Sequence, residues 1–117
     1  MAAGSDFPVE EPNPLLGFYA AVTRQDAAGQ PAGGWMPDQR LTRTQALRAF
    51  TIDAAYAAHA ETLVGSIEPG KLADIVVLNT DVMQVPDPLI LQTSVVTTII
   101  GGNIVYQALG GLQWNSP

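Results

Sequence analysis

Residues 63–78 read Leu-Val-Gly-Ser-Ile-Glu-Pro-Gly-Lys-Leu-Ala-Asp-Ile-Val-Val-Leu, and no other part of the chain constrains its fold as strongly. At the centre, Pro69 and Gly70 are typical of a type II turn, because proline presets φ at the first central position and glycine supplies positive φ at the second. Residues 74–78 are a short apolar run rich in β-branched side chains. Such a run favours a strand buried on both faces, although a short buried helix has the same pattern. Residues 63–67 predict a weaker strand.

Helical patterns precede and follow this stretch. Asn13 offers an N-cap oxygen, and Pro14 suits the first position of a helix. Thr42 and Gln45 form a capping box, in which each side chain satisfies a backbone N–H of the first turn. Asp53 can cap a further, alanine-rich helix. The predicted helices cover residues 14–24, 43–52 and 54–60, and a single helical turn is predicted over residues 87–91.

Two further strands are predicted after the turn. Gly101 and Gly102 lie between two β-branched runs and indicate a two-residue hairpin, because a type I′ turn requires positive φ twice. The tail over residues 107–117, which contains Trp114, has no regular pattern. The predicted strands cover residues 75–78, 95–100 and 103–106. We expect the core to contain Leu47, Phe50, Ile67, Leu72, Ile75, Val77, Ile99 and Val105.

The composition predicts one domain at most and argues against several partners. Of the 117 residues, 47% are hydrophobic and 14% are charged, which is enough for a modest core. The net charge of −6 argues against nucleic acid and anionic membranes, since both require clustered Lys and Arg. No apolar run reaches the ~20 residues of a membrane span. Cysteine is absent and residues 1–4 do not resemble a signal peptide, so the compartment stays undetermined, with the cytoplasm as the default expectation.

Two motifs, in this order, give the chain a resemblance to a known family. Residues 4–9 read Gly-Ser-Asp-Phe-Pro-Val, and residues 65–78 contain the Gly-Ser-Ile-Glu-Pro-Gly-Lys-Leu-Ala-Asp run. Together they resemble the C-terminal part of metal-dependent amidohydrolases, over nearly the whole chain. The resemblance looks closest to the family-3-like branch that includes enzymes cleaving formamides and N-acyl amides. It implies a mixed α/β fold and one partial domain, with the loop and helices that end a TIM-like barrel in residues 1–60 and strands of a small composite β-sandwich in residues 61–117.

Asp6 is the candidate site residue. In the family that the chain resembles, the Gly-Ser-Asp segment ends the eighth barrel strand, and its aspartate binds the metal and accepts a proton from the attacking water. The resemblance therefore implies that Asp6 is a catalytic residue and a metal ligand in a complete enzyme, with zinc or another divalent metal as the cofactor. Barrel enzymes do place catalytic groups at the C-terminal ends of strands. The alternative is that Asp6 is a solvated acid near the chain terminus.

The other metal ligands of the family are not found in this sequence. It has no His-x-His motif, and His59, its single histidine, is expected on the surface at the C-terminus of a helix. Lys71, its single lysine, lies in the predicted turn. A catalytic zinc site generally needs about three protein ligands and an open position. We therefore expect this chain alone to hold no cofactor.

Three functions are compatible with these observations. The first is the C-terminal portion of a metal-dependent amidohydrolase that hydrolyses C–N bonds of non-peptide amides, inactive as an isolated chain. The second is a non-catalytic folding or interaction module that uses the sandwich to form an oligomer. The third is a subunit that completes its site, and so binds a small-molecule amide, only with another chain. We expect a homo-oligomer, because exposed strand edges and apolar patches favour pairing with another copy.

Overall fold

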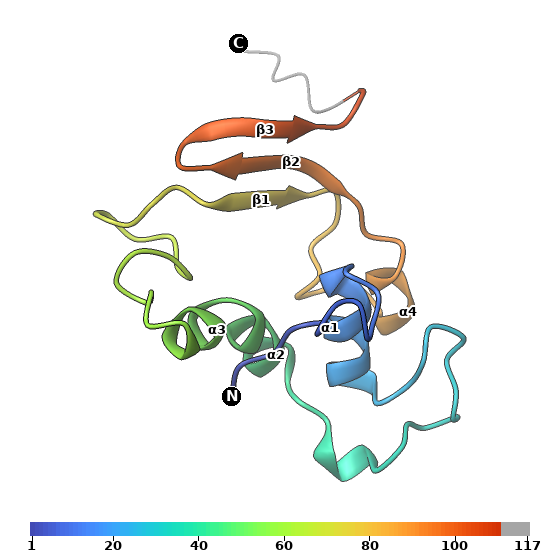
Figure 1. Ribbon diagram of the computed structural model, residues 1–117. Helices are drawn as coiled ribbons and strands as arrows, with labels where there is room; N and C mark the ends of the chain where they lie inside the picture. The colour runs from blue at the N-terminus through green and yellow to red at the C-terminus, as the bar shows by residue number, and fades with distance from the viewer. Residues whose placement is uncertain (111–117) are drawn as a thin grey trace.

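The structure is a computed structural model that describes residues 1–110. The fold is mixed α/β, as predicted, and Figure 1 shows a helical part with a three-stranded sheet standing beyond it. In chain order the elements are α1 (Pro14–Thr23), η1 (Pro37–Gln39), α2 (Arg43–Phe50), α3 (Ile52–Ala57), β1 (Ile75–Leu78), α4 (Asp87–Ile90), β2 (Val95–Ile100) and β3 (Asn103–Gln107). Within the described residues, no helix has the length and hydrophobicity needed to traverse a bilayer.

The helices begin where their capping residues predict. The side chain of Asn13 accepts a hydrogen bond from the backbone N–H of Leu15 at 3.0 Å, and the capping box of Thr42 and Gln45 is complete at the start of α2. The division between α2 and α3 differs from the prediction, because it falls at Thr51 rather than at Asp53. The hydroxyl of Thr51 donates to the carbonyl of Leu47 at 2.7 Å, which competes with continuation of the helix at this point.

The sheet has the order β1-β2-β3, and both pairs of strands are antiparallel. The hairpin between β2 and β3 is confirmed, since Gly101 and Gly102 both have positive φ, of 55° and 82°. The turn before β1 is also confirmed, with φ of 91° at Gly70. The weak strand predicted over residues 63–67 is wrong. The N–H groups of Leu63 and Val64 both donate to Ala60, at 2.9 and 3.0 Å, which continues the chain in turns after α3.

The hydrophobic core lies between α1, α2, α4 and the segment that joins β1 to α4. Ala46 and Ile90 are fully buried where α2 and α4 meet α1. Among the described strands, only β1 contributes to this cluster, through Leu78 at its end. The buried members of the cluster are Phe18, Tyr19, Val22, Ala46, Val82 and Ile90.

The predicted core is therefore largely wrong. Four of its members are exposed, with exposed fractions of 42% for Leu47, 82% for Ile67, 54% for Leu72 and 58% for Val105. The other four, Phe50, Ile75, Val77 and Ile99, are half-buried. The reason is that the sheet is not packed closely on the helices: a cleft of about 390 Å³, lined by Phe50, Ala55 and Ser66 among others, lies between them. Residues 75–78 do form a strand, but it is not buried on both faces.

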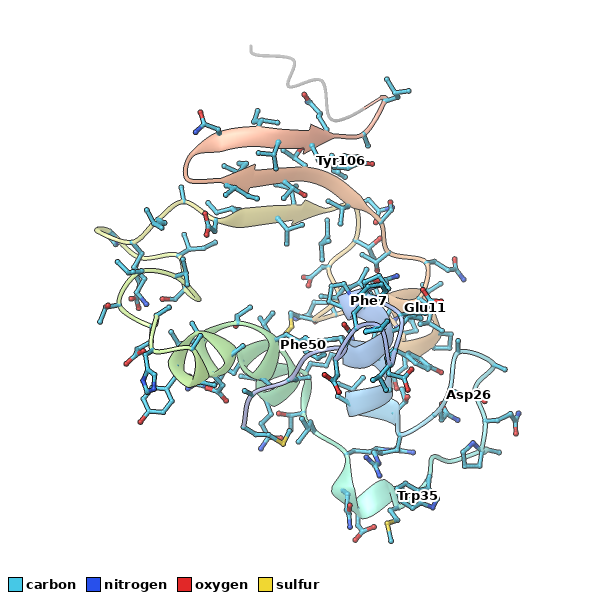
Figure 2. All side chains as sticks on the ribbon, viewed as in Figure 1. Phe7, Glu11, Asp26, Trp35, Phe50 and Tyr106 are labelled. Atoms are coloured by element: carbon cyan, nitrogen blue, oxygen red, sulfur yellow. The ribbon has the colours of Figure 1, made fainter. Side chains whose placement is uncertain are left out.

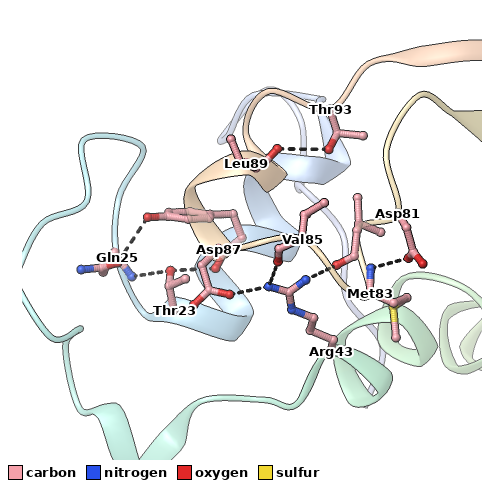
Figure 3. A network of polar contacts seen from close by, with 11 residues as sticks. Thr23, Gln25, Arg43, Asp81, Met83, Val85, Asp87, Leu89 and Thr93 are labelled. Atoms are coloured by element: carbon pink, nitrogen blue, oxygen red, sulfur yellow. Dashed lines mark hydrogen bonds and ion pairs between the residues drawn. The ribbon is translucent and has the colours of Figure 1, made fainter.

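Arg43 connects the start of α2 to the segment that follows β1 (Figure 3). Its guanidinium donates to the backbone carbonyls of Val82 and Val85, at 2.6 and 2.5 Å, and to a carboxylate oxygen of Asp87 at 2.6 Å. The side chain of Arg43 is 20% exposed. Because the guanidinium is planar and always charged, one side chain can hold all three acceptors in a fixed arrangement.

We predict that Arg43→Met lowers the free energy of unfolding by about 2–3 kcal/mol, because hydrogen bonds from a charged donor are lost and carbonyls are left unpaired. Urea denaturation of the variant and the parent measures the difference. Arg48→Met is the matched control, since the Arg48 side chain is 61% exposed and, within residues 1–110, pairs with Asp53 alone. Its effect is expected to stay within about 0.5 kcal/mol. Equal effects of the two substitutions would contradict the role given to Arg43.

We predict that replacing Gly65 costs more stability than replacing Gly70. Both glycines have a φ of 91°, so the backbone strain is the same and only the surroundings of the new side chain differ. A Cβ at Gly65 would lie 2.8 Å from the Cβ of Ala55 and 2.9 Å from the Cα of Ile52, whereas a Cβ at Gly70 meets nothing within 4 Å. Gly70→Ala should therefore cost only the backbone strain, about 1–2 kcal/mol. Gly65→Ala should cost an additional ~1–3 kcal/mol from overpacking. Thermal unfolding of the two variants tests this, and equal melting temperatures would refute it.

Candidate functional site

Asp6 lies in a tight turn between the first residues of the chain and α1. Its φ is 52°, and its carbonyl accepts a hydrogen bond from the N–H of Val9 at 2.9 Å. The segment before it is attached to α2, because the N–H of Ala3 donates to the carbonyl of Ala49 at 2.9 Å. The Asp6 residue is exposed. The turn therefore presents the carboxylate to solvent from a backbone that is fixed on the helical part.

A cavity of about 390 Å³ lies beside this segment. Gly4 and Ser5 form part of its lining, while Asp6 itself does not. Side chains of opposite character meet there: Phe50 and Leu16 are apolar, and three carboxylates belong to Glu10, Glu11 and Asp26. Figure 2 shows Phe7 and Glu11 close to α1, with Asp26 farther along the loop that leaves this helix. The sequence did not single out these three acids, because they lie in loops without a recognisable spacing.

The described residues do not fit a metal ion on their own. Residues 1–110 contain no group of three or more His, Asp or Glu side chains that could hold one. His59 is exposed just after α3, with a φ of 55°, as expected for a surface residue at a helix end. A single exposed carboxylate at Asp6 falls short of the about three protein ligands of a catalytic zinc site. Any metal site with three protein ligands that uses Asp6 must take at least one of them from outside the described residues.

Lys71 is less exposed than its place in a turn suggests. Its side chain is only 12% exposed, and its ammonium lies 2.6 Å from the hydroxyl of Ser66 and 3.4 Å from a carboxylate oxygen of Glu68. Glu68 and Lys71 are three residues apart in the sequence, which is close enough for their side chains to pair across the turn. The contact to Ser66 closes the loop before β1. Because the carboxylate keeps the ammonium paired, we assign these residues to the turn and not to a reaction.

The fold and the site thus define a mixed α/β segment with one candidate catalytic carboxylate, and residues 1–110 hold no group of side chains that could bind a catalytic metal by themselves. A sequence model of the amidohydrolase family matches residues 1–106. This chain belongs to the amidohydrolase family. The match confirms the resemblance that the two sequence motifs indicate.

Curated relatives of the chain are much longer than the chain itself. The protein LONG AFTER FAR-RED 3 of Arabidopsis thaliana is 41% identical over 106 residues, which is 91% of this chain and 18% of that protein. The N-substituted formamide deformylase of Arthrobacter pascens is 32% identical over 110 residues, or 94% of this chain and 20% of the enzyme. The chain therefore spans about a fifth of the length of these relatives.

Among solved structures, an amidohydrolase from Thermotoga maritima MSB8 is similar to this chain, with 28% sequence identity and a TM-score of 0.48. The similarity covers 77% of this chain and 20% of that structure.

We predict that the purified chain does not hold zinc in stoichiometric amounts. It contains one histidine and no cysteine, and isolated carboxylates favour harder ions at low affinity. Elemental analysis after dialysis against a mild chelator measures the metal content. One tightly held transition metal per chain would show that ligands have been overlooked.

Proposed function

We propose that this chain is the C-terminal portion of a metal-dependent amidohydrolase that hydrolyses C–N bonds of non-peptide amides, and that it is inactive alone. One observation carries the proposal: the family match extends over residues 1–106, while the chain spans only about a fifth of its curated relatives. The name of the Arthrobacter pascens relative, an N-substituted formamide deformylase, supports the class of substrate.

The two parts of the fold correspond to two parts of such an enzyme. We infer that residues 1–60 are the end of a TIM-like barrel and that residues 61–117 supply strands to a small β-sandwich. The sheet supports this division, because every residue of β3 is exposed and the core cluster includes only Leu78 from the strands. A sheet with so much exposed apolar surface is expected to be covered by another layer.

Asp6 is the residue that this segment would contribute to the reaction. In the complete enzyme Asp6 would be one ligand of a divalent metal whose remaining ligands come at least in part from outside the described residues, and such a metal would supply an activated water for attack on the amide carbon. The part of Asp6 is to accept a proton at its carboxylate, which is the role of a general base. The hydrogen bond that closes the turn at Asp6 and the bond from Ala3 to Ala49 support this role, since a general base must be held in reach of the proton it removes.

A subunit that completes its site with another chain would use Asp6 in the same way. A non-catalytic module is the second candidate function, and the exposed apolar residues of β3 favour it. In the catalytic functions Asp6 accepts a proton, whereas in a non-catalytic module Asp6 has no role in a reaction. Substitution of Asp6 therefore distinguishes the two classes.

We predict that Asp6→Asn leaves the stability of the isolated chain unchanged to within about 0.5 kcal/mol, because Asp6 is exposed and asparagine tolerates positive φ. In a full-length family enzyme that contains this segment, the same substitution should lower turnover by ~10²–10⁴, since asparagine cannot accept the proton.

The assay compares the full-length variant with its parent on an amide that the parent cleaves. Asp38→Asn serves as the control, because Asp38 is an exposed aspartate in η1, away from the segment that carries Asp6. Its turnover is expected to equal that of the parent. Comparable rates for Asp6→Asn and the parent would mean that Asp6 is an ordinary loop acid.

A further inference from the structure

The carbonyl groups at the end of α2 are paired in a way that stops the helix. The last four carbonyls of an α-helix have no partner within it, and in α2 they belong to residues 47–50. Thr51 donates to two of them, through its hydroxyl to Leu47 at 2.7 Å and through its N–H to Arg48 at 3.1 Å. In a continuous α-helix the N–H of Thr51 would donate to Leu47. Because the hydroxyl takes that acceptor, the N–H pairs with the next carbonyl and the helix ends.

A third carbonyl of this helix end holds the segment that carries Asp6. The carbonyl of Ala49 accepts a hydrogen bond from the N–H of Ala3 at 2.9 Å. If α2 continued through Thr51 as a regular helix, the N–H of Asp53 would become the partner of the same carbonyl. The end of α2 therefore leaves an acceptor available to a segment that is distant in the sequence.

The other end of the Asp6 segment is fixed on α1. It leads to Asn13, whose side chain caps that helix. The two helices are in close contact, because the ring of Phe50 lies against Gly17, where an added Cβ would be 2.7 Å from the ring carbon Cζ. Figure 2 shows Phe50 beside α1. The turn at Asp6 thus lies between two attachments, one on α2 and one on α1, and close packing limits how far apart they can move.

We propose that Thr51 is a positioning residue for Asp6. By occupying the carbonyls of Leu47 and Arg48, it ends α2 and leaves the carbonyl of Ala49 to the Asp6 segment. A displacement of about 1 Å in a group that acts on the reacting atoms can lower the rate of a reaction ~10²-fold, so this attachment matters to turnover. The inference rests on the proposed function, because it assigns Thr51 a part in the reaction through Asp6.

The first test measures hydrogen exchange by NMR in the full 117-residue chain and needs no activity. Thr51→Val removes the hydroxyl and keeps the shape of the side chain, so the helix can continue and compete for the carbonyl that Ala3 uses. Exchange of the Ala3 N–H should become about fivefold faster. The N–H of Leu41, which donates to Ala21 at 2.9 Å, is the internal reference and should exchange as in the parent. Thr51→Ser keeps the hydroxyl and should restore the parent rate at Ala3.

The second test measures kcat and KM in a full-length family enzyme that contains this segment. Thr51→Val should lower kcat about tenfold with KM unchanged, because a misplaced proton acceptor weakens transition-state stabilisation and not substrate binding. Thr51→Ser should keep the parent kcat. Thr93→Val is the matched control: the hydroxyl of Thr93 donates to the carbonyl of Leu89 at 3.3 Å with the same spacing of four residues, just after α4. Its kcat should equal that of the parent.

The outcomes separate this inference from the proposed function. If Asp6→Asn lowers turnover while Thr51→Val keeps the parent kcat, the role of Thr51 is overturned and the role of Asp6 stands. If Asp6→Asn keeps the parent turnover, both roles are overturned. An Ala3 N–H that exchanges in the parent as fast as in an unfolded chain, or equal losses of kcat in Thr51→Val and Thr93→Val, would also overturn the role of Thr51.

Discussion

The three hydrogen bonds of Arg43 attach α2 to the part of the chain that follows β1. They join the start of α2 to two carbonyls in the segment that leads from β1 to α4 and to the carboxylate of Asp87 in α4. These acceptors lie 39 to 44 residues away in the sequence. α4 then packs on α1, and Ile90 is fully buried there. The attachment lies between the end of β1 and the start of β2 in the sequence. It therefore constrains where these two strands of the sheet meet the helices.

The small number of cations explains why the surface is acidic: the chain has five Lys and Arg residues and eleven Asp and Glu residues. Every lysine and arginine of the chain is engaged in holding a loop or a helix end, through Arg24, Arg40, Arg43, Arg48 and Lys71. Arg24, for example, donates to the carbonyl of Trp35 at 3.0 Å and lies over the indole ring of that residue. Because these five cations form ion pairs with only three of the eleven carboxylates, most of the carboxylates of the chain face solvent without a counter-charge. The uncharged sheet is the exception to this acidic surface.

Features that depend on neighbouring residues could be predicted from the sequence, and features that depend on distant contacts could not. The capping box at Thr42 and the turn at Gly70 involve residues within one turn of each other, so the local sequence specifies them. The burial of Ile67 and Val105 was mispredicted, because an apolar pattern shows that a strand can be covered but not that a partner is present. At the candidate site, the family motif indicates Asp6, whose role stays a prediction, while the acids around the neighbouring cavity come from separate loops and have no common signal.

The exposed sheet also relates the candidate functions to one another. If further strands of a longer polypeptide cover the sheet, they do so at an effective concentration of roughly millimolar, which short connections provide. A second copy at micromolar concentration would then be displaced, because an intramolecular partner avoids most of the entropic cost of association. The described residues include no further strand that covers β3, and the expectation of a homo-oligomer depends on this exposed strand. We therefore expect the same apolar strand to be available either to a further layer of a longer polypeptide or to a second copy. Whether further strands are joined to the sheet covalently determines which of the two contacts is favoured.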